Sequence, residues 1–422
     1  MSFFSRNDIP YIPENQFAFR PQHSCEDCLC VSITRWLHSM DDDAYCGIVF
    51  ADMSKAFDRV QHAKLIEELS HLGIGGKVLE WFSSYLSDRV QTVRAGDDLG
   101  DPKPCTRGVP QGSVLGPVLF SIYIRQAPGC FQHSTSQLYA DDIAFYVTHE
   151  DSQVVSHRLN NDLAALDNYL NTKGLVLNPN KTQFVVVRRP GREIPDDLSL
   201  SCQGVAIRPV ASARYLGVII DEHLCFRNQV EAVCKAVNQK TGAFKHNRAN
   251  LNHHAKRTFY LSVIQSTLEY ASTAYVHCLA QQQYDLLLKC ARIALKKIFG
   301  LDRRTPSEIL YTHTKICSLE QRLNFKLYVL VYRALHGQSS SLLRDFFTPR
   351  AAGPHTAAIT RGQATAALVL PPAHTRHGFR AISYLAANRW NALPADCRQA
   401  PSPASFRALI KSHLGLPVRR RR

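Results

Sequence analysis

The chain has 422 residues, enough to bury a large core and to form several domains. Apolar residues make up 45% of it, which excludes a disordered chain, and no stretch approaches about 18 uninterrupted apolar residues, which argues against a membrane-spanning helix. The net charge is +15, and the 13 cysteines, an odd number without regular spacing, indicate a reduced, intracellular protein.

The positive charge is concentrated near the C-terminus. From Arg350 to Arg422 there are twelve basic residues and one acidic residue, Asp396, so this region carries +11 and the preceding residues only +4. An excess of this kind is typical of proteins that bind a phosphate-rich partner such as RNA or DNA, although a basic tail that only improves solubility has the same composition. The terminal run Arg419–Arg422 also resembles, weakly, a nuclear import signal.

Short strands alternate with amphipathic helices in the first half of the chain. The helix Asp151–Thr172 is indicated by Val154, Leu159, Leu163, Leu166 and Leu170, which recur at roughly helical spacing. The other predicted elements of this half are a helix at Cys25–Met40, a strand at Tyr45–Ala51, a glycine-broken helix at Ala63–Ser87, a helix at Val118–Ile124, and strands at Gln137–Tyr139, Ile143–Val147, Thr182–Val187 and Tyr215–Ile220.

From about Phe226 onward the pattern becomes helical. Helices are predicted at Asn228–Arg248, His253–Tyr275, Gln281–Phe299 and Leu319–His336. The segment Thr348–Pro372 is rich in Ala, Thr, Pro and Gly and is predicted to be a linker.

Two acidic stretches stand at the ends of apolar strands. Asp52 follows the strand Tyr45–Ala51, and Asp141 and Asp142 lie between two apolar strands. A buried ionised carboxylate costs several kcal/mol unless it is compensated, and divalent cations are the usual compensation when several carboxylates meet. Alone, each stretch is a weak signal, because Asp-Asp is also an ordinary turn dipeptide.

A glycine-rich segment, Arg107–Pro117, lies between the two acidic strands. Its three glycines allow close approach of another molecule to the backbone, and its prolines stiffen the loop. Such a loop at the start of a helix is suited to contact a nucleotide or a template base, but it is equally well read as a plain strand-to-helix connection.

Together, these segments resemble the successive palm motifs of reverse transcriptases, in the same order. The motif sequences resemble those of non-LTR (LINE-type) retrotransposon enzymes, most clearly in Ser54-Lys-Ala-Phe-Asp58, Gly108-Val-Pro-Gln-Gly-Ser113 and Tyr139-Ala-Asp-Asp142. Further segments that match are Gly174–Thr182, Tyr215–Val218 and, as in the Jockey-like branches, Ala291-Arg292, Phe325-Lys326, Leu335-His-Gly337, Trp390-Asn-Ala-Leu-Pro394 and Phe406. The resemblance spans about residue 14 to residue 413.

The resemblance implies a metal-dependent polymerase site. Asp52, Asp141 and Asp142 would be the carboxylates that bind two Mg²⁺ ions, with Mn²⁺ as a substitute, and Asp142 would point partly away because side chains alternate along a strand. Lys181 would protonate or steady the leaving pyrophosphate; otherwise it is a turn lysine. The chemistry would be transfer of dNTPs to a primer 3′-hydroxyl.

The same resemblance assigns the substrate contacts. Phe57 would be the steric gate that rejects a 2′-hydroxyl, although without the motif it would be read as a core aromatic. Gln111 and Gly112 would contact the incoming nucleotide and the template. Arg20 would grip the triphosphate, and its alternative is a surface arginine. A hairpin with Tyr215, Leu216 and Gly217 would support the primer end.

The implied fold class is α+β, a right-hand polymerase with a palm of antiparallel sheet packed by helices. Partial fingers are predicted at residues 1–45, the palm at 46–225, an all-helical thumb at 226–310, and a helical, basic nucleic-acid-binding extension at 311–422. The resemblance implies a chain that is N-terminally truncated, because full-length elements carry an endonuclease domain before the polymerase and no segment of this sequence matches that domain. It also departs from the family after Ile124, where relatives have Asn-Asp-Leu-Pro and this chain has Arg125-Gln-Ala-Pro128.

The expected partners are an RNA template, a DNA primer and dNTPs, with no membrane; a separately encoded endonuclease or an RNP protein of the element is a further candidate. The expected location is the nucleus and cytoplasmic RNP particles. Two alternatives stay open on the residues alone. One is a catalytically inactive RNA- or DNA-binding remnant of such an element. The other is a relative of group II intron maturases or telomerase, which the sequence of Ser54–Asp58 and the region around Trp390 disfavour.

Overall fold

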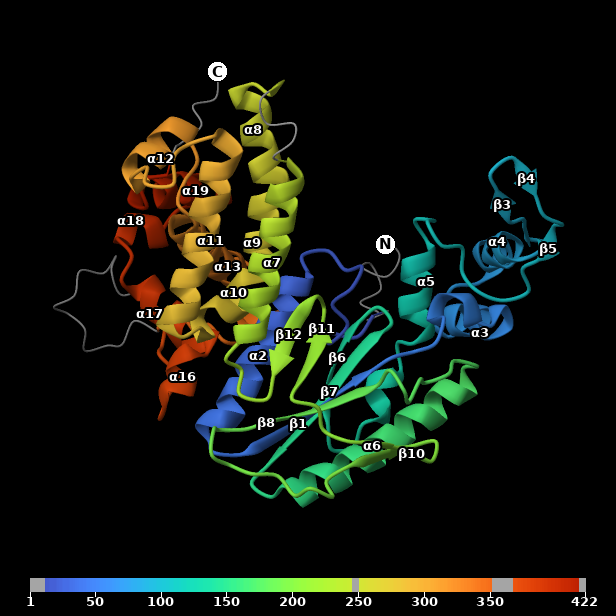
Figure 1. Ribbon diagram of the computed structural model, residues 1–422. Coiled ribbons are helices and arrows are strands. Elements are labelled where there is room, and N and C mark those ends of the chain that lie inside the picture. Colours follow the sequence, from blue (N-terminus) through green and yellow to red (C-terminus); the bar gives the residue numbers. More distant parts are fainter. Residues whose placement is uncertain (1–11, 245–249, 351–366, 417–422) are drawn as a thin grey trace. The chain divides into compact units, whose positions relative to one another are not determined.

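The structure, a computed structural model, describes residues 12–244, 250–350 and 367–416 (Figure 1). The chain divides into two compact units: unit 1 comprises Met1–Ser24 and Ala44–Ala213, and unit 2 comprises Cys25–Asp43 and Arg214–Arg422. The predicted finger, palm and thumb boundaries are not tested by this division and stay predictions. Arg419–Arg422 and most of the predicted linker Thr348–Pro372 lie outside the described residues.

Unit 1 is built on a four-stranded antiparallel sheet. Its strands are β1 (Tyr45–Ala51), β6 (Thr135–Tyr139), β7 (Asp142–His149) and β8 (Gln183–Val187), in the order β6-β7-β1-β8. The central strand β1 is almost entirely buried, as its apolar sequence predicts. The carboxyl end of β1 and the β6–β7 turn therefore lie at the same edge of the sheet.

The long helix α6 (Ser152–Thr172) packs along one face of this sheet (Figure 1). Asp151 caps the helix by accepting a hydrogen bond from the backbone N–H of Gln153 at 2.8 Å. The helix approaches closely because β1 has a glycine at position 47, where a Cβ atom would lie only 2.4 Å from Val155 Cγ1. The sequence pattern placed Val154 on the apolar stripe, but the structure buries Val155 there instead.

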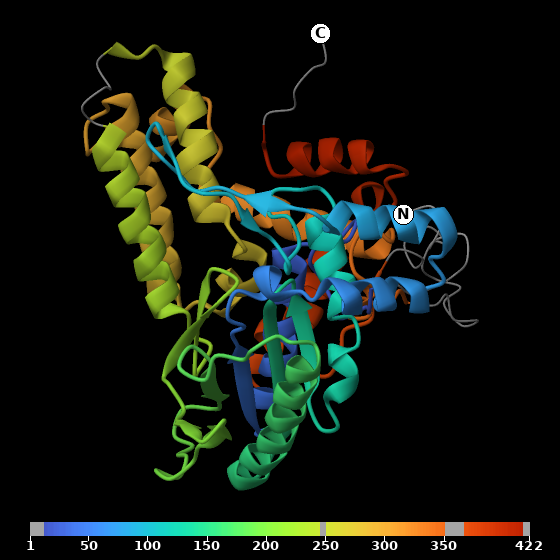
Figure 2. The same cartoon turned by 90° about the vertical axis from the view of Figure 1, so that its right-hand side faces the viewer.

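Unit 1 has further elements outside this sheet. They are η1 (Ala56–Arg59), α3 (His62–His71), α4 (Gly76–Leu86), β2 (Val90–Gln91), β3 (Arg94–Ala95), β4 (Asp98–Leu99), β5 (Lys103–Pro104), α5 (Gly116–Tyr123), η2 (Ala127–Cys130), β9 (Leu200–Cys202) and β10 (Val205–Ile207). The segment between β2 and β5 is a two-stranded arm with every strand residue exposed, which reaches away from the four-stranded sheet (Figure 2).

Unit 2 is mostly helical. It contains α2 (Cys25–Asp41), α7 (Arg227–Phe244), α8 (His253–Phe259), η4 (Tyr260–Gln265, a π-helical turn), α9 (Ser266–Glu269), α10 (Ser272–Tyr275), η5 (Val276–Cys278), α11 (Gln281–Phe299), α12 (Ser307–Thr314), α13 (Leu319–Leu335), α14 (Ser341–Arg344), α16 (Arg376–Arg380), α17 (Ile382–Asn391), α18 (Ala395–Arg398) and α19 (Pro403–His413). Helices α7 and α11 lie side by side.

Two predicted elements were wrong in outline. The strand predicted over Tyr215–Ile220 is a hairpin of β11 (Ser212–Tyr215) and β12 (Val218–Asp221), because Leu216 and Gly217 both have positive φ angles, 44° and 81°. The helix predicted over His253–Tyr275 is interrupted at Tyr270 and Ala271, where Ala271 is left-handed at φ 48°.

The residues near the C-terminus that resemble Jockey-like elements form core contacts in unit 2. Trp390 and Phe406 are both buried, with ring centroids 5.7 Å apart, and Tyr332 stacks on Phe406 at 4.2 Å. Asn391 exchanges two hydrogen bonds with the backbone of Leu368, at 2.7 and 2.9 Å. The matching residues Trp390, Asn391 and Phe406 therefore stabilise the packing of unit 2.

The fold class predicted from the sequence, α+β with a small antiparallel sheet packed by helices and followed by a helical region, is confirmed. Within the described ranges, no helix combines the length and the apolar character needed to cross a bilayer.

Candidate active site

The antiparallel register brings the three predicted carboxylates to one end of the sheet. β1 pairs with β7 up to Ala51 opposite Ile143, so Asp52 is opposite Asp142 if the same register continues by one residue. Tyr139 pairs with Asp142 across the β6–β7 hairpin, which leaves Ala140 and Asp141 as its two-residue turn. Ala140 adopts a positive φ of 57°, as tight hairpins require.

The carboxylates influence one another electrostatically. Burial, followed by the charges of Asp141 and Asp52, raises the pKa of Asp142 to about 6, although this side chain keeps an exposed face. Burial is also the largest cause that raises the pKa of Asp141; a hydrogen bond with its own backbone opposes the shift, and the Asp52 charge adds to it. Without a counter-charge, the site disfavours the ionised forms of both residues.

Asp52 is anchored through its backbone. Its N–H donates to Thr182 Oγ1 at 3.4 Å, and its carbonyl accepts from the N–H of Asn178 at 2.8 Å. The side-chain atom Oδ2 is buried and has no hydrogen-bond partner among the residues that the structure describes, and the Lys181 ammonium lies 4.0 Å from it. The segment Asn178–Thr182 thus holds the predicted catalytic lysine beside the predicted metal ligand.

This donor set fits a divalent cation by its chemistry. Carboxylate oxygens are the ligands that Mg²⁺ prefers, and an ion would satisfy the unpartnered Asp52 Oδ2 and lower the cost of ionising Asp141 and Asp142. As the side chains are placed, no group of three His, Cys, Asp or Glu residues in the described part of the chain surrounds a common point closely enough to hold an ion. The carboxylates would therefore have to turn toward a shared ion.

Gln16 supports the turn that carries Asp141, and its role was not identified from the sequence. Its side-chain Oε1 accepts hydrogen bonds from the backbone N–H of Ala140 and of Ala18, both at 3.0 Å. The backbone beside it pairs with β6, because Phe17 N–H donates to the carbonyl of Leu138 at 2.8 Å. No local sequence pattern predicts this role, because Gln16 and Ala140 are 124 residues apart in the sequence.

Phe57 occupies the helical turn η1 after Asp52. Its ring is half-buried and stacks on Phe120 of α5, with centroids 4.3 Å apart and planes inclined by 24°. Lys55 precedes the turn in a left-handed conformation and ends the extended run from β1. The ring is therefore held in a fixed orientation, as both a steric gate and a core aromatic require.

The glycine-rich loop borders a hollow of about 760 Å³. Gln111 is exposed and donates through Nε2 to Asp58 Oδ1 at 2.8 Å, while Gly112 has a φ of 81° that favours glycine. Three basic side chains, Lys55, Arg89 and Arg107, line the same hollow. Their charge suits a polyphosphate or a nucleic-acid backbone.

Arg20 is engaged locally in this structure. Its Nη1 donates to the carbonyls of Pro13 and Gln16, at 2.8 and 3.3 Å, and thereby closes the loop that precedes α2. The predicted contact with a triphosphate is not tested by these bonds, and it stays a prediction.

Arg125, the first residue at which the chain departs from the family sequence, forms an ion pair. Arg125 Nε lies 3.0 Å from Oε2 of the buried Glu68, and Lys173 Nζ lies 2.5 Å from Oε1 of the same carboxylate. Burial would raise the pKa of Glu68, but hydrogen bonds from Lys173 and Arg125 lower it below its usual value. The substituted residue therefore helps to neutralise a buried charge between α3 and α5.

The three residues predicted to support the primer, Tyr215, Leu216 and Gly217, belong to unit 2. The Tyr215 hydroxyl lies 3.4 Å from Cys28 Sγ, and the Leu216 carbonyl accepts a hydrogen bond from the Tyr270 hydroxyl at 2.8 Å. A Cβ atom on Gly217 would lie 3.1 Å from the Tyr270 ring, so glycine is favoured both by space and by its φ. These contacts fix the shape of the turn.

Unit 2 has a basic surface of its own, which was not identified from the sequence. It is a hollow of about 620 Å³ on α11, lined by the cations Lys289, Arg292, Lys296, Lys297 and Arg303. Four of them recur at helical spacing along α11, so the pattern was present in the sequence. We call this surface the α11 basic hollow.

A family model described as "Reverse transcriptase (RNA-dependent DNA polymerase)" matches residues 4–220. The chain belongs to this family. The match contains the β1, β6–β7 and glycine-rich segments described above, so the resemblance inferred from the motifs is confirmed. Reverse transcriptases in general use divalent metal ions, which agrees with the donor chemistry of the three aspartates.

Several curated relatives are polymerases of non-LTR retrotransposons. The chain is 29% identical over 266 residues to "Probable RNA-directed DNA polymerase from transposon BS" of Drosophila melanogaster, a match covering 60% of this chain and 29% of the relative. It is 29% identical over 231 residues to "RNA-directed DNA polymerase from mobile element jockey" of Drosophila funebris, covering 53% of this chain and 25% of the relative. These matches span less than a third of the relatives' length.

Solved structures with some similarity include telomerases. "Structure of telomerase from Candida albicans in complexe with TWJ fragment of telomeric RNA" matches at 16% identity with a TM-score of 0.38, over 70% of this chain and 55% of that one. "Structure of apo telomerase from Candida Tropicalis" matches at 14% identity with a TM-score of 0.38, over 76% of this chain and 51% of that one.

Proposed function

We propose that this chain is an RNA-directed DNA polymerase domain of the non-LTR retrotransposon type, which transfers dNTPs to a primer 3′-hydroxyl on an RNA template. The observation that carries the proposal is the meeting of Asp52 with the Asp141–Asp142 hairpin at one end of the antiparallel sheet. Phosphoryl transfer depends mainly on positioning and on neutralising charge, and three carboxylates at one end of a sheet could supply both once they turn toward shared metal ions.

Asp52, Asp141 and Asp142 would hold the metal ions. Two bound Mg²⁺ ions, or Mn²⁺ in their place, would supply an activated 3′-hydroxyl and a stabilised pyrophosphate. The chain's own contribution is to keep three carboxylates together at an electrostatic cost, as the raised pKa values of Asp141 and Asp142 indicate. Gln16 keeps the turn in place by accepting the Ala140 N–H.

Lys181 would act on the leaving group. Its ammonium is 4.0 Å from Asp52 Oδ2, and its side chain is 68% exposed, so it can move from the carboxylate toward a pyrophosphate oxygen. In that position it could donate a proton or stabilise the charge that develops there.

Phe57 would select deoxyribose. Its stacking on Phe120 would oppose movement of the ring, so a 2′-hydroxyl that meets the ring would be rejected. Gln111 and Gly112 would contact the nucleotide and the template strand beside the hollow bordered by Lys55, Arg89 and Arg107. Arg20 would grip the triphosphate after exchanging its backbone carbonyl partners for phosphate oxygens.

The nucleic-acid partners would be held partly by unit 2. Tyr215, Leu216 and Gly217 would support the primer end, and the α11 basic hollow would bind the phosphate backbone. We include an RNA template, a DNA primer and dNTPs among the partners. A separate endonuclease or RNP protein of the element, and a nuclear location, are further parts of the proposal.

Primer extension tests the proposal directly. The protein is incubated with poly(rA), oligo(dT) and dTTP, with Mg²⁺ or with EDTA, beside Asp141→Asn and a control, Asp196→Asn, which changes an exposed aspartate far along the chain. We expect extension that needs Mg²⁺, is lost in Asp141→Asn and is retained in the control. Salt-sensitive template binding without any extension would instead support the alternative of an inactive nucleic-acid-binding remnant.

A further inference from the structure

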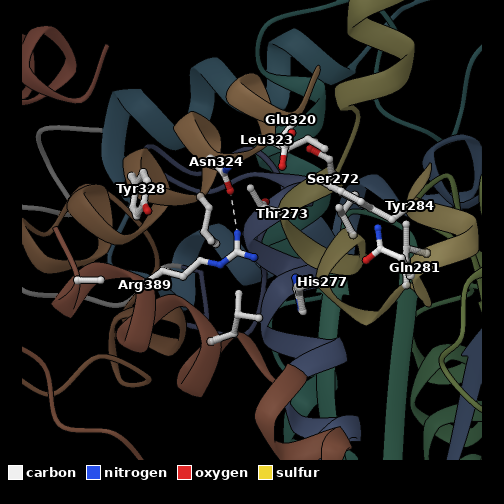
Figure 3. A pocket seen from close by; sticks show the side chains of 15 residues that line it. Ser272, Thr273, His277, Gln281, Tyr284, Glu320, Leu323, Asn324, Tyr328 and Arg389 are labelled. Atoms are coloured by element: carbon white, nitrogen blue, oxygen red, sulfur yellow. Dashed lines mark hydrogen bonds between the residues drawn. The ribbon is translucent and has the colours of Figure 1, made fainter. Parts of the chain in front are cut away.

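Unit 2 contains a hollow that none of the predicted polymerase roles uses. Its volume is about 420 Å³, within the range of about 300–1,000 Å³ typical of small-ligand sites. It lies between the segment from α10 to α11 and helices α13 and α17, as Figure 3 shows. The polar and aromatic side chains at its wall are those of Ser272, Thr273, His277, Gln281, Tyr284, Glu320, Asn324, Tyr328 and Arg389.

One wall atom is buried without a partner. The Nε2 atom of His277 is inaccessible to solvent and makes no hydrogen bond within the described residues. Burial, followed by the charges of Arg389 and Arg380, lowers the pKa of His277 to about 3, so the imidazole is neutral at physiological pH. Because a water molecule cannot reach this atom, a ligand in the hollow would meet the neutral imidazole of His277 as part of the wall and would make no hydrogen bond with Nε2 as the side chain is placed.

The guanidinium of Arg389 is oriented at the wall of the hollow. Its Nη1 donates to Asn324 Oδ1 at 2.8 Å, a bond drawn in Figure 3, where the head group extends between α13 and α17. No other hydrogen bond of this side chain is present in the described ranges, which leaves further N–H donors for a ligand. Glu320, an exposed carboxylate on the same wall, provides only acceptors.

Aromatic and polar groups are combined here as in sites that recognise an unpaired base. Tyr284 and Tyr328 provide ring surfaces on which a planar ring could stack. A guanine presents two acceptors, O6 and N7, which suit an arginine fork, while its N1–H and N2–H₂ donors suit a carboxylate. Because Arg389 and Glu320 carry opposite charges and His277 is neutral, the site is better matched to a neutral base than to a free anion.

We propose that this hollow binds a single unpaired guanine nucleotide of a single-stranded RNA, with Arg389 and Glu320 reading the base and the two tyrosines available for stacking. The inference rests on the proposed function insofar as that function brings RNA to the chain. It goes beyond it, because the site would recognise a base outside the template–primer duplex and would give the domain a sequence preference for its RNA.

The test compares two fluorescein-labelled oligouridines, one with a single central guanosine and one with adenosine there, binding to the full chain by fluorescence anisotropy. We expect at least about fivefold tighter binding of the guanosine probe. Arg389→Lys and Glu320→Gln should each abolish most of this preference. The matched control Arg407→Lys, which changes an exposed arginine of α19 and also keeps the charge, should retain it.

Location is checked by placing 6-thioguanosine in the probe, irradiating, and mapping the crosslinked peptide by mass spectrometry. A crosslink in α11, α13 or α17 supports the proposal. Equal affinity for both probes, a preference unchanged in Arg389→Lys, or a crosslink only within residues 44–213 would overturn it.

The same variants separate this inference from the proposed function. Arg389→Lys should extend oligo(dT) on poly(rA) at the normal rate, whereas Asp141→Asn should lose extension and keep the guanosine preference. A chain that prefers the guanosine probe but never extends the primer would refute the proposed function alone. A chain that extends the primer but shows no preference for guanosine would refute guanine binding in the hollow alone.

Discussion

Glu68 offers a sharp test of the packing of unit 1. This carboxylate is 5% exposed and lies between Arg125 and Lys173, whose side chains are 21% and 13% exposed. Glu68→Gln would keep the shape but leave two largely buried cations without their counter-ion. Breaking a buried pair costs about 3–5 kcal/mol, and because the cations retain some water and the amide oxygen can accept one bond, we expect about 2–3 kcal/mol.

The assay is thermal and urea unfolding of the full chain. A loss of about 2–3 kcal/mol should lower the melting temperature of a domain of this size by roughly 5–10 °C. The control is Glu67→Gln, which changes the exposed neighbour; Glu67 has no ion pair with any described residue, and its substitution should change the melting temperature by less than about 2 °C. Equal effects of the two substitutions would refute the reasoning.

The pH dependence has a definite sign. Because Lys173 and Arg125 hold the pKa of Glu68 below its usual 4.5, ionised Glu68 stabilises the folded state above about pH 4.5. That contribution is lost as the pH falls through the lowered pKa of the folded state. The difference in unfolding free energy between the wild-type chain and Glu68→Gln should therefore be full at pH 7 and shrink progressively below pH 4.5.

Three further predictions concern the candidate site. Asp142→Asn should raise the melting temperature in EDTA by a few degrees, since it removes the cost of a partly buried charge and its repulsion with Asp141 and Asp52, together about 1 kcal/mol after screening by solvent; a lower value would contradict the electrostatic account. Phe57→Val should increase incorporation of rNTPs relative to dNTPs in single-nucleotide extension assays, and Phe57→Tyr should not; unchanged selectivity in both would remove Phe57 from this role. Gln16→Ala should leave circular dichroism unchanged but slow extension about tenfold, because the Ala140 N–H loses its acceptor; a normal rate would show that the turn holds its shape unaided.

Local signals predicted much of the fold. The strand Tyr45–Ala51 and the helix Gln281–Phe299 have the same bounds in the structure as in the sequence interpretation. In the first, a run of buried apolar residues is decisive, and in the second, apolar spacing leads up to a left-handed Gly300 that ends the helix. These elements depend little on distant parts of the chain.

Periodicity did not predict the elements that are shaped by distant contacts, although the family resemblance implied a hairpin at Tyr215, Leu216 and Gly217. The helix expected over His253–Tyr275 breaks where Tyr270 leaves the helical conformation, and the Tyr270 hydroxyl bonds the Leu216 carbonyl, 54 residues away in sequence. The same contact accompanies the turn that divides the strand expected over Tyr215–Ile220. Periodicity contains no information about such a contact, so a long uninterrupted element was the natural expectation.

The candidate site shows the same contrast. The carboxylates Asp52, Asp141 and Asp142 were identified from motif order, and the strand register then brings them to one end of the sheet. Gln16 could not have been found, because its importance depends on a bond to Ala140. The position of Arg389 at the wall of a hollow likewise depends on the packing of the surrounding helices, which the local sequence does not predict.

The central claim is that this chain copies RNA into DNA with the Asp52 and Asp141–Asp142 carboxylates. The most direct measurement is extension of a DNA primer on an RNA of mixed sequence with all four dNTPs, followed by sequencing of the product, for the wild-type chain and Asp52→Asn. We predict a product complementary to the RNA that requires Mg²⁺, disappears when the template is digested with ribonuclease beforehand, and is absent with Asp52→Asn. Synthesis that persists without the Asp52 carboxylate, or a product unrelated to the template sequence, would contradict the account.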